Sequence, residues 1–385
     1  MSMKTIAVLG STGSIGRQTL DVLRAAPAGA YQVAALCARG NTELLLSQVQ
    51  EFRPAFVGVE DKKAARVIKP LLPEGTELAA GEEAASIAAA LPQVDVVVNG
   101  VSGFAGTEPL LRALGAGKTV ALANKESIVC AHALVDAALK KGGAIVPVDS
   151  EQSAIFQCLK GGAHSEVARL WLTASGGPFR EYDKAQLAAV TAADALHHPT
   201  WNMGAKITID SATLFNKGLE IMEASYLFGI EGERIKVLVH PESIVHSMVE
   251  FCDGSTMAQL SRPDMRLAIH YALTYPARMP SPFGALDLAK AGKLTFFEPD
   301  GARFPSIPMA YAALKEGQVL PIAYNAANEA AVARFRQGQI GFYDIFRAVE
   351  YAMGHMPKQK ISAFADVLEL DREARRLAEK AMEKN

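Results

Sequence analysis

Two carboxylates stand two residues apart at the end of an apolar run. The run "AIVPV" passes into "DSE", so that Asp149 and Glu151 flank Ser150. If this segment is extended, side chains alternate between faces, and positions 149 and 151 point the same way. Two neighbouring anions repel, and the repulsion is relieved when one takes a proton, as in a general acid/base pair, or when a cation lies between them. A strand exit with two solvated charges is the alternative.

A glycine-rich segment near the N-terminus has the residues of a phosphate-binding turn. In "VLGSTGSIGRQTL", Gly10, Gly13 and Gly16 lie between a predicted strand and a predicted helix. Glycines there let a pyrophosphate approach the backbone and meet free N–H groups at the positive end of the helix. The spacing is G-x-x-G-x-x-G rather than the commoner G-x-G-x-x-G, and a tight strand–helix turn without a ligand would use the same residues.

The end of the second predicted strand bears on the choice of nucleotide. An NAD site usually places an acidic residue there for the ribose hydroxyls. This chain has "CARGN", with Arg39 and Asn41 at that place. A cation and an amide suit the additional phosphate of NADP, so the sequence favours NADP over NAD. An ordinary solvated arginine is the alternative interpretation of Arg39.

Two further segments place polar residues directly after predicted strands. "ALANKES" ends a strand with Lys125, which would fix a substrate hydroxyl or the cofactor, or lie in solvent. "LTASGGPF" leaves Ser175 beside Gly176 and Gly177. Small residues in a row expose backbone N–H groups, which form a concavity that binds anions.

The segment "DSATLFNKGLE" predicts a helix with three polar side chains on adjoining faces. Asp210 or Ser211 is the predicted N-cap. Asn216 and Glu220 are four residues apart, which puts one over the other with Lys217 near both. A salt-bridged surface face would show the same pattern.

Histidines and a tryptophan stand in two segments that surround this helix. The loop "ALHHPTWNMGAKI" holds His198 and Trp201. A loop tryptophan indicates a ligand contact or a lid that excludes water, unless it packs under its own loop. In "VHPESIVHS", His240 and His246 are predicted to be polar groups satisfied within a strand pair, unless a phosphate lies near them.

The pattern of apolar runs predicts which elements position these residues. Through about residue 150, short apolar runs alternate with amphipathic stretches, which indicates a doubly wound parallel sheet with ligands at the carboxyl ends of its strands. A mixed α+β pattern follows, with a hairpin turn at Asp253-Gly254, then a proline-rich connector and a helical bundle. The predicted domains are 1–149 for the nucleotide, 150–275 for catalysis with a lid loop at 195–205, a connector at 276–308 and a bundle at 309–385.

Charge and cysteine content exclude several classes of partner. The net charge is −2 with both signs interspersed, so no field favours nucleic acid or an anionic membrane. No apolar run reaches the roughly 20 residues that span a bilayer. Four cysteines without C-x-x-C spacing, and an N-terminus that passes from "MSMK" straight into a strand-like run, predict a cytoplasmic protein without a targeting segment.

The motifs, taken in order, are similar to those of a known family. "GSTGSIG", "ALANKES", "PVDSE", "SGGPFR", "HPTWNMG", "DSAT" with "NKGLE", "VHPESIVHS" and "NAANE" resemble 1-deoxy-D-xylulose 5-phosphate reductoisomerases from residue 4 to beyond residue 330. One departure is "CARGN", where the family usually has a glycine-lysine-asparagine turn, so Arg39 stands for a lysine. The resemblance implies rearrangement and NADPH-dependent reduction of that phosphorylated sugar to 2-C-methyl-D-erythritol 4-phosphate, in non-mevalonate isoprenoid synthesis.

The resemblance also implies an architecture and an assembly. The implied subunit is V-shaped, with an N-terminal Rossmann-like domain, an α+β catalytic domain and a C-terminal helical bundle. The implied assembly is a homodimer, and the strands in "VHPESIVHSMVEFCDGSTMAQL" are the candidate interface.

Roles for individual residues follow from the resemblance. One divalent cation, Mg²⁺ or Mn²⁺ with Co²⁺ as a further candidate, would be held by Asp149, Glu151 and Glu220. The implied catalytic residues are Lys125, Asp149, Glu151, Glu220 and His246. The implied substrate-binding residues are Lys125, Ser150, Glu151, Ser175, His198, Trp201, Ser211, Asn216, Lys217 and Glu220. The implied cofactor-binding residues are Gly10, Ser11, Thr12, Gly13, Ser14, Ile15, Arg39, Gly40, Asn41, Asn124, Glu126, Met203 and Gly204.

Two other functions compete with this interpretation. A semialdehyde dehydrogenase has a similar glycine-rich turn, but it needs a nucleophilic cysteine, and no cysteine here has a recognisable active-site setting. A non-catalytic NADP-sensing protein would be expected to lose its metal ligands first, whereas Asp149, Glu151 and Glu220 are all present.

Overall fold

The structure is a computed structural model that describes residues 3–201 and 203–383. Contacts between Cα atoms divide the chain into two compact units. Unit 1 comprises Met1–Ser127, Leu134–Asp149 and Asp264–Gly284. Unit 2 comprises Ile128–Ala133, Ser150–Pro263 and Ala285–Asn385. Neither unit is one continuous stretch of chain.

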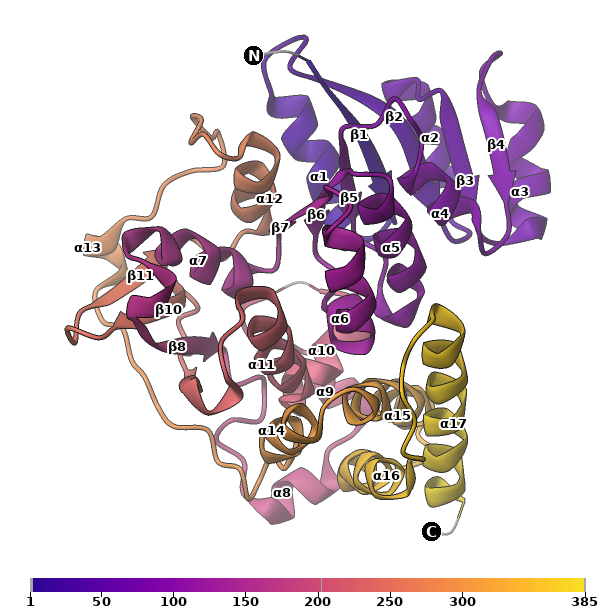
Figure 1. The fold of residues 1–385 in the computed structure, drawn as a ribbon. Helices are drawn as coiled ribbons and strands as arrows, with labels where there is room; N and C mark the ends of the chain where they lie inside the picture. Colours follow the sequence, from indigo (N-terminus) through magenta and orange to yellow (C-terminus); the bar gives the residue numbers. More distant parts are fainter. Residues whose placement is uncertain (1–2, 202, 384–385) are drawn as a thin grey trace. The chain divides into compact units, whose positions relative to one another are not determined.

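Unit 1 contains a seven-stranded sheet in the order β4-β3-β2-β1-β5-β6-β7, with every neighbouring pair parallel (Figure 1). The strands are β1 Lys4–Leu9, β2 Tyr31–Ala38, β3 Phe56–Val59, β4 Glu77–Ala80, β5 Val96–Asn99, β6 Thr119–Leu122 and β7 Ala144–Pro147. The helices are α1 Ser14–Ala25, α2 Thr42–Phe52, α3 Lys62–Ile68, η1 Lys69–Leu71, α4 Ala84–Ala89, η2 Gly103–Gly106, α5 Thr107–Gly115, α6 Lys125–Leu139 and α12 Met265–Thr274. The middle of α6, Ile128–Ala133, belongs to unit 2.

The composition of the central strands explains this sheet. All four residues of β5, "VVVN", are buried. The last four residues of β1, "IAVL", are buried as well. Strands covered on both faces read as continuous apolar runs, which is the pattern of a parallel sheet. The predicted doubly wound parallel sheet is confirmed. One strand, β4, was not among the predicted runs, because its sequence "ELAA" is short and only partly buried.

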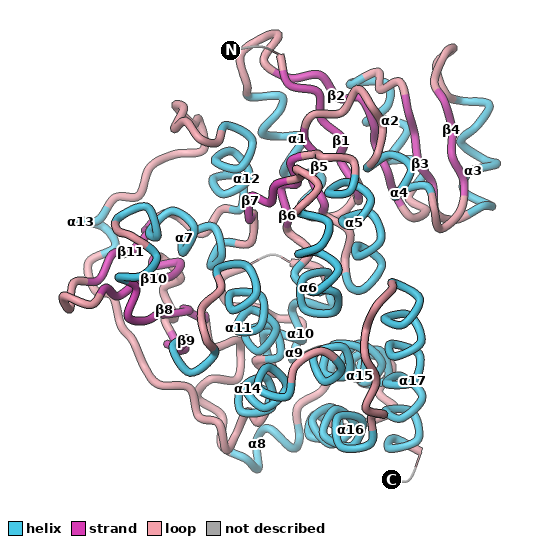
Figure 2. The backbone as a smooth tube through the Cα atoms, viewed as in Figure 1, coloured by secondary structure: helices cyan, strands magenta, loops and turns pink. Residues whose placement is uncertain are grey.

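Unit 2 contains a second, mixed sheet in the order β11-β10-β8-β9 (Figure 2). Its strands are β8 Val167–Ala174, β9 Ile235–Val239, β10 Val245–Phe251 and β11 Thr256–Leu260. β10 pairs antiparallel with β11 across Asp253-Gly254, so the predicted hairpin is confirmed. The helices before and around this sheet are α7 Ser150–Cys158, η3 Leu159–Gly161, η4 His164–Glu166, α8 Lys184–Ala189, α9 Ala192–Ala195, α10 Ala205–Ala212, α11 Phe215–Phe228 and η5 Gly232–Arg234.

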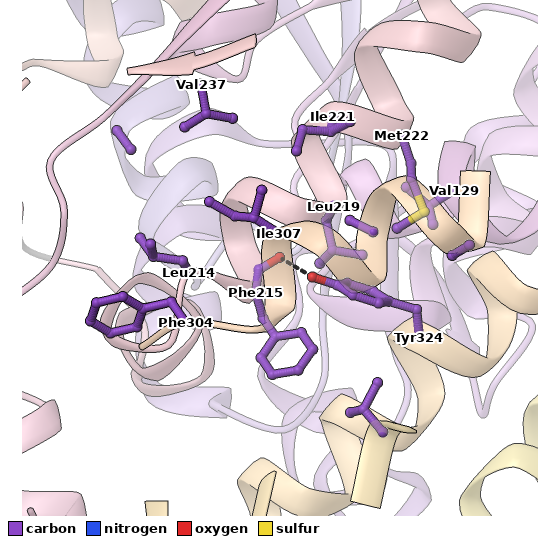
Figure 3. Packing of buried hydrophobic residues seen from close by; sticks show 14 of the residues in the cluster. Val129, Leu214, Phe215, Leu219, Ile221, Met222, Val237, Phe304, Ile307 and Tyr324 are labelled. Atoms are coloured by element: carbon purple, nitrogen blue, oxygen red, sulfur yellow. Dashed lines mark hydrogen bonds between the residues drawn. The ribbon is translucent and has the colours of Figure 1, made fainter. Parts of the chain in front are cut away.

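The C-terminal part of unit 2 is helical, as predicted. After the short helix α13 Leu288–Ala291, the chain forms α14 Ser306–Glu316, α15 Val319–Arg336, α16 Phe342–His355 and α17 Phe364–Met382. The last three helices pack on one another, and α14 packs on both α11 and α15. The buried core of unit 2 runs without a break from the sheet through α11 into these helices (Figure 3). None of the helices in the described residues has the length and apolar character needed to cross a membrane.

Candidate active site

The segment that carries Asp149 and Glu151 is a strand end followed at once by a helix. β7 ends at Pro147, and Ser150 is the first residue of α7. The expectation that both carboxylates lie on one extended segment is therefore wrong. Glu151 lies in the first turn of α7, where the positive end of the helix dipole favours a carboxylate. The boundary between the two units passes through this motif, between residues 149 and 150.

Helix α11 brings a third carboxylate to this place. Ligand atoms from Asp149, Glu151 and Glu220 all lie within 4.8 Å of one another. Glu220 is fully buried, and the other two are partly exposed. The predicted pairing on α11 is confirmed, since Asn216 Nδ2 donates to Glu220 Oε1 at 2.5 Å. Three carboxylates so close together would repel strongly without a compensating positive charge.

Lys217 supplies positive charge to this cluster. Its Nζ donates to Glu151 Oε1 at 2.6 Å and also donates to Glu220 Oε2. Burial lowers the pKa of Lys217, but the charges and hydrogen bonds of Glu151 and Glu220 outweigh burial and raise it above its usual 10.5. Lys217 and Glu220 are both buried, so the alternative of a solvated surface face on this helix is wrong.

The carboxylate cluster suits a hard divalent cation. Carboxylate oxygens from three residues are the donor type that Mg²⁺ and Mn²⁺ prefer, whereas zinc and copper sites usually include histidine or cysteine. Ser150 Oγ donates to Glu151 Oε2 at 2.5 Å and thereby orients that carboxylate. Gln152 Nε2 donates to the carbonyl of Glu220 at 3.0 Å and ties α7 to α11. Gln152 was not predicted, although it directly follows Glu151 in the sequence.

In unit 1, Lys125 is a buried partner of Asp149. The two residues form an ion pair, with Lys125 Nζ 2.7 Å from Asp149 Oδ2. Lys125 begins α6, and Asn124 caps that helix by accepting a hydrogen bond from the N–H of Ser127 at 2.9 Å. Asn124 Nδ2 also donates to the carbonyls of Val101 and Gly103. The alternative of a solvated loop lysine is therefore wrong for Lys125.

A second group of polar side chains gathers around His198. Its Nδ1 accepts hydrogen bonds from the backbone N–H groups of Thr200 and Trp201, so the ring proton lies on Nε2. That Nε2 lies 3.0 Å from Ser175 Oγ and 3.1 Å from Ser211 Oγ. Burial lowers the pKa of His198 from its usual 6.5 to about 4, so the ring is neutral at pH 7. It is thus a hydrogen-bond donor here and not a cation.

Glycine allows the loop that carries Ser175 to lie close to α10. Gly176 and Gly177 both have positive φ, and a Cβ on Gly177 would lie 2.7 Å from the carbonyl oxygen of Ser211. The loop that carries Ser175 therefore packs directly against α10, and both serine hydroxyls reach the same atom of His198. The prediction that Asp210 or Ser211 is an N-cap is wrong: both lie within α10, and the N-cap of α11 is Leu214 in a left-handed conformation. The sequence "SATLF" contains no proline or glycine that would have marked this break.

The two histidines of "VHPESIVHS" differ in their surroundings. His240 Nε2 accepts from the N–H groups of Ile244 and Val245, and its Nδ1 lies 2.8 Å from the carbonyl of Thr295, so it is a satisfied structural group as predicted. His246 is buried, and its Nε2 has no hydrogen-bond partner in the described part of the chain. The rings of His246 and Trp201 lie 6.2 Å apart between centroids. Trp201 therefore approaches β10 as well as its own loop. The lid loop predicted at 195–205 includes Asn202, which lies outside the described residues.

The glycine-rich turn of unit 1 has the geometry of a phosphate-binding turn. Gly10 follows β1 with φ of +75°, and Gly13 is the N-cap of α1. A Cβ on Gly16 would lie 2.3 Å from the carbonyl oxygen of Gly10, so only glycine fits there. Gln48 of α2, which was not predicted, donates from Nε2 to the carbonyl of Ser11 at 2.9 Å and holds the turn.

The side chain predicted to bind the additional phosphate of NADP is exposed. Arg39 is 87% exposed, and its Nε lies 3.6 Å from Glu60 Oε1. Asn41 caps α2, since its Oδ1 accepts from the N–H of Leu44 at 3.2 Å. Met203 is partly buried, and Gly204 is the exposed N-cap of α10 in unit 2. All of the predicted cofactor contacts, including those of Gly40, Glu126, Met203 and Gly204, stay predictions.

Comparisons with known proteins agree on one family. Family profiles described as "1-deoxy-D-xylulose 5-phosphate reductoisomerase", as the C-terminal domain of that enzyme, and as "DXP reductoisomerase C-terminal domain" match residues 6–132, 145–228 and 260–377. The chain is 47% identical over 382 residues to the 1-deoxy-D-xylulose 5-phosphate reductoisomerase of Geobacter sp. (strain M21), covering 99% of each chain. It is 50% identical over 380 residues to that of Heliobacterium modesticaldum, covering 98% of this chain and 97% of the relative.

Solved structures extend the likeness to the fold. The 1-deoxy-D-xylulose 5-phosphate reductoisomerase of Zymomonas mobilis in complex with NADPH has a TM-score of 0.92 and 42% identity, covering 99% of this chain and all of that one. A DOX-P reductoisomerase in complex with NADPH, fosmidomycin and magnesium has a TM-score of 0.93 and 36% identity, covering 99% of this chain and 98% of that one.

Proposed function

The chain belongs to the 1-deoxy-D-xylulose 5-phosphate reductoisomerase family, and from this premise we propose how its own residues carry out the family's reaction. The protein is an NADPH- and metal-dependent enzyme that converts 1-deoxy-D-xylulose 5-phosphate to 2-C-methyl-D-erythritol 4-phosphate. The observation that carries the residue assignments is the cluster of Asp149, Glu151 and Glu220, whose ligand atoms lie within 4.8 Å of one another.

Asp149, Glu151 and Glu220 would hold the divalent cation. When bound, Mg²⁺ or Mn²⁺ supplies a Lewis acid for the negative charge that develops on substrate oxygens. The chain's own part is to keep the carboxylates ionised and oriented. Ser150 orients Glu151, and Asn216 orients Glu220, each through a hydrogen bond of 2.5 Å. Lys125 holds Asp149 through its ion pair of 2.7 Å.

Ser175, His198 and Ser211 would bind the substrate phosphate, together with Asn216 and Lys217. The neutral His198 offers the proton on Nε2, and both serine hydroxyls already lie within 3.1 Å of that atom. The phosphate itself takes no part in the reaction. The free energy of binding it to fixed hydrogen-bond donors orients the reacting end of the substrate. Trp201 would cover the bound substrate and exclude water.

His246 would donate to, or accept from, an oxygen near the reacting carbons. Its buried Nε2 is the support for this role, because a buried polar atom without a partner costs free energy unless a ligand supplies one. Burial lowers the pKa of His246, and the charge of Glu151 and the backbone hydrogen bonds of Ser261 and Arg262 oppose burial in part.

NADPH would bind at the glycine-rich turn of unit 1 and supply the hydride. The N–H groups of Thr12, Ser14 and Ile15 lie at the start of α1, where the helix dipole favours a pyrophosphate. Arg39, Gly40 and Asn41 would meet the adenosine phosphate, and Asn124, Glu126, Met203 and Gly204 the rest of the cofactor.

The function is tested by following NADPH absorbance with 1-deoxy-D-xylulose 5-phosphate as substrate. We expect oxidation that requires Mg²⁺ or Mn²⁺, stops on addition of EDTA, and returns when the metal is restored in excess. The product should be identified as 2-C-methyl-D-erythritol 4-phosphate. Oxidation that persists in EDTA would contradict the role of the carboxylate cluster. Cys37 is unsuited to be the nucleophile of a semialdehyde dehydrogenase mechanism, because it is buried and burial raises its pKa to about 12.

We also propose that the protein is a homodimer that pairs through β11. This edge strand is exposed from Thr256 to Ala258, and exposed edge strands pair readily with another chain. Light scattering on the purified protein should give twice the 41.0 kDa of one chain. Ala258→Lys, which places a charge on the edge, should shift the mass towards one chain, whereas Ala193→Lys, at an exposed position in α9, should not. A wild-type mass of one chain would contradict the proposal.

A cytoplasmic location is proposed on separate grounds. The four cysteines form no disulfide within the described residues, and three of them are buried. Free thiols persist in a reducing compartment.

A further inference from the structure

Helix α15 of the C-terminal bundle carries three fully buried polar side chains in "YNAANE". These are Tyr324, Asn325 and Asn328. Buried amides and hydroxyls cost free energy unless they are hydrogen-bonded, so each needs a specific partner. Tyr324 and Asn328 are four residues apart and lie on the same face of the helix.

Asn328 binds a carboxylate on a helix of the proposed phosphate site. Its Nδ2 donates to Asp210 Oδ1 at 2.8 Å, and the two residues are 118 positions apart in the chain. The other oxygen of that buried carboxylate, Oδ2, lies 2.8 Å from Lys206 Nζ, one turn earlier in α10. Asp210 is therefore held from its own helix on one side and from α15 on the other.

The position of Asp210 makes this contact relevant to the site. Asp210 directly precedes Ser211, whose Oγ lies 3.1 Å from His198 Nε2. Both residues lie in the last turn of α10, which ends at Ala212. A displacement of this turn would move the Ser211 hydroxyl away from His198 and from Ser175.

Tyr324, one turn earlier on α15, contacts the segment around the junction of α10 and α11. Its hydroxyl lies 3.1 Å from the carbonyl of Ser306 and 3.5 Å from that of Phe215 (Figure 3). Ser306 Oγ in turn donates to the carbonyl of Thr213 at 2.7 Å. Thr213 and Phe215 flank the left-handed Leu214, where α10 ends and α11 begins.

A glycine of α11 is fitted to the same tyrosine. A Cβ on Gly218 would lie 1.8 Å from Tyr324 Oη and 2.7 Å from its Cζ. Gly218 follows Lys217 and lies two residues before Glu220. One face of α15 thus contacts both the end of α10 and the start of α11.

We propose that Asn328 and Tyr324 are positioning residues, through which α15 sets the orientation of the phosphate-binding side chains on α10 and α11. Within the described residues, their side-chain hydrogen bonds go to Asp210 and to backbone carbonyls, not to a side chain assigned to the substrate. They act through Asp210 and through the backbone at residues 213–215. The proposal rests on the assignment of Ser175, His198 and Ser211 to the substrate phosphate.

The test is Asn328→Leu, which keeps the size of the side chain and removes its donor. We expect the KM for 1-deoxy-D-xylulose 5-phosphate to rise about tenfold or more, because a hydrogen bond to a charged group is lost. The KM for NADPH should stay within about twofold of wild type. A loss of folded enzyme alone would lower the apparent kcat and would not raise the substrate KM. Asn325→Leu is the matched control. Asn325 is equally buried on the same helix, but its side chain donates within α15, to Glu329 at 3.3 Å.

A double-mutant cycle with Ser211→Ala separates this proposal from the phosphate assignment. Ser211→Ala alone should raise the substrate KM, and if it does not, the phosphate assignment fails. Added to Asn328→Leu it should raise the KM by less than the product of the two single effects, because both changes disturb one contact set. A rise with Ser211→Ala but none with Asn328→Leu would overturn the positioning role, and so would equal losses in Asn328→Leu and Asn325→Leu.

Tyr324→Phe provides a second test that keeps the packing of the ring. The substrate KM should rise severalfold while the melting temperature changes little, because a single hydroxyl is removed. An unchanged substrate KM in Tyr324→Phe would remove Tyr324 from the proposal. This result is informative even if Asn328→Leu does not fold.

Discussion

Replacing Glu220 with glutamine is expected to abolish turnover while NADPH affinity stays near that of the wild type. Glu220 is the buried member of the carboxylate cluster, and its two oxygens are held by Asn216 and Lys217. Glutamine keeps the shape but removes the negative charge, so a divalent cation loses one of its three anionic partners. If the cation contributes several kcal/mol to transition-state stabilisation, kcat should fall by about a thousandfold or more.

The measurement for Glu220→Gln is Mn²⁺ binding followed by electron paramagnetic resonance, beside NADPH binding followed by fluorescence and an assay of residual turnover. The half-saturating Mn²⁺ concentration should rise sharply, whereas the Kd for NADPH should not change. Glu231→Gln is the control for loss of one charge, because Glu231 is exposed just beyond α11. Glu220→Asp keeps a carboxylate on a shorter side chain and should retain intermediate activity. Normal turnover in Glu220→Gln would show that the third ligand is assigned wrongly.

Replacing Gly16 with alanine is expected to impair NADPH binding strongly. A Cβ at this position would lie 2.3 Å from the oxygen of Gly10, 2.4 Å from Ser11 Cα and 2.7 Å from the carbonyl carbon of Ser11. These are backbone atoms of the turn itself, so the clash is relieved only by moving the turn away from α1. Overpacking of this kind typically costs about 1–3 kcal/mol, and we expect a rise in the KM for NADPH of about ten- to a hundredfold.

The control for Gly16→Ala is Gly115→Ala. Gly115 ends α5 in the same unit, and a Cβ there would meet no atom within 4 Å. Kinetics at saturating and limiting NADPH would separate the two variants. Gly115→Ala should match the wild type, and a Gly16→Ala variant with an unchanged KM for NADPH would contradict the assignment of the turn to the cofactor phosphates.

Patterns among neighbouring residues predicted the elements that depend on neighbouring residues, which are the buried parallel strands and the hairpin turn. The parallel strands read as apolar runs because both their faces are covered, and the hairpin at Asp253-Gly254 was marked by its turn residues. β4 escaped notice because "ELAA" is a short edge strand. No sequence signal marks the start of α7 at Ser150. Asp149 and Glu151 do lie close together, but not for the predicted reason that both stand on one extended segment.

Within the site, the sequence predicted the contact between residues that lie four apart on one helix. The contact of Asn216 with Glu220 followed from helical spacing. The contacts that join distant segments did not, because no local pattern encodes them: Asn328 meets Asp210 across 118 positions, and Gln48 meets Ser11 across 37. The break between α10 and α11 was missed for a related reason, since Leu214 adopts its left-handed conformation without any glycine.

The discontinuity of unit 1 has a consequence for biosynthesis. Helix α12 belongs to this unit and packs on α1 and beside β6 and β7, although it lies more than a hundred residues after the last strand of the sheet. A ribosome delivers the chain from the N-terminus, and domains generally fold as they emerge. Here unit 1 lacks one covering helix until most of unit 2 has been synthesised. The nascent sheet therefore exposes an apolar face during translation, and completing this unit is a late, long-range step rather than an early local one.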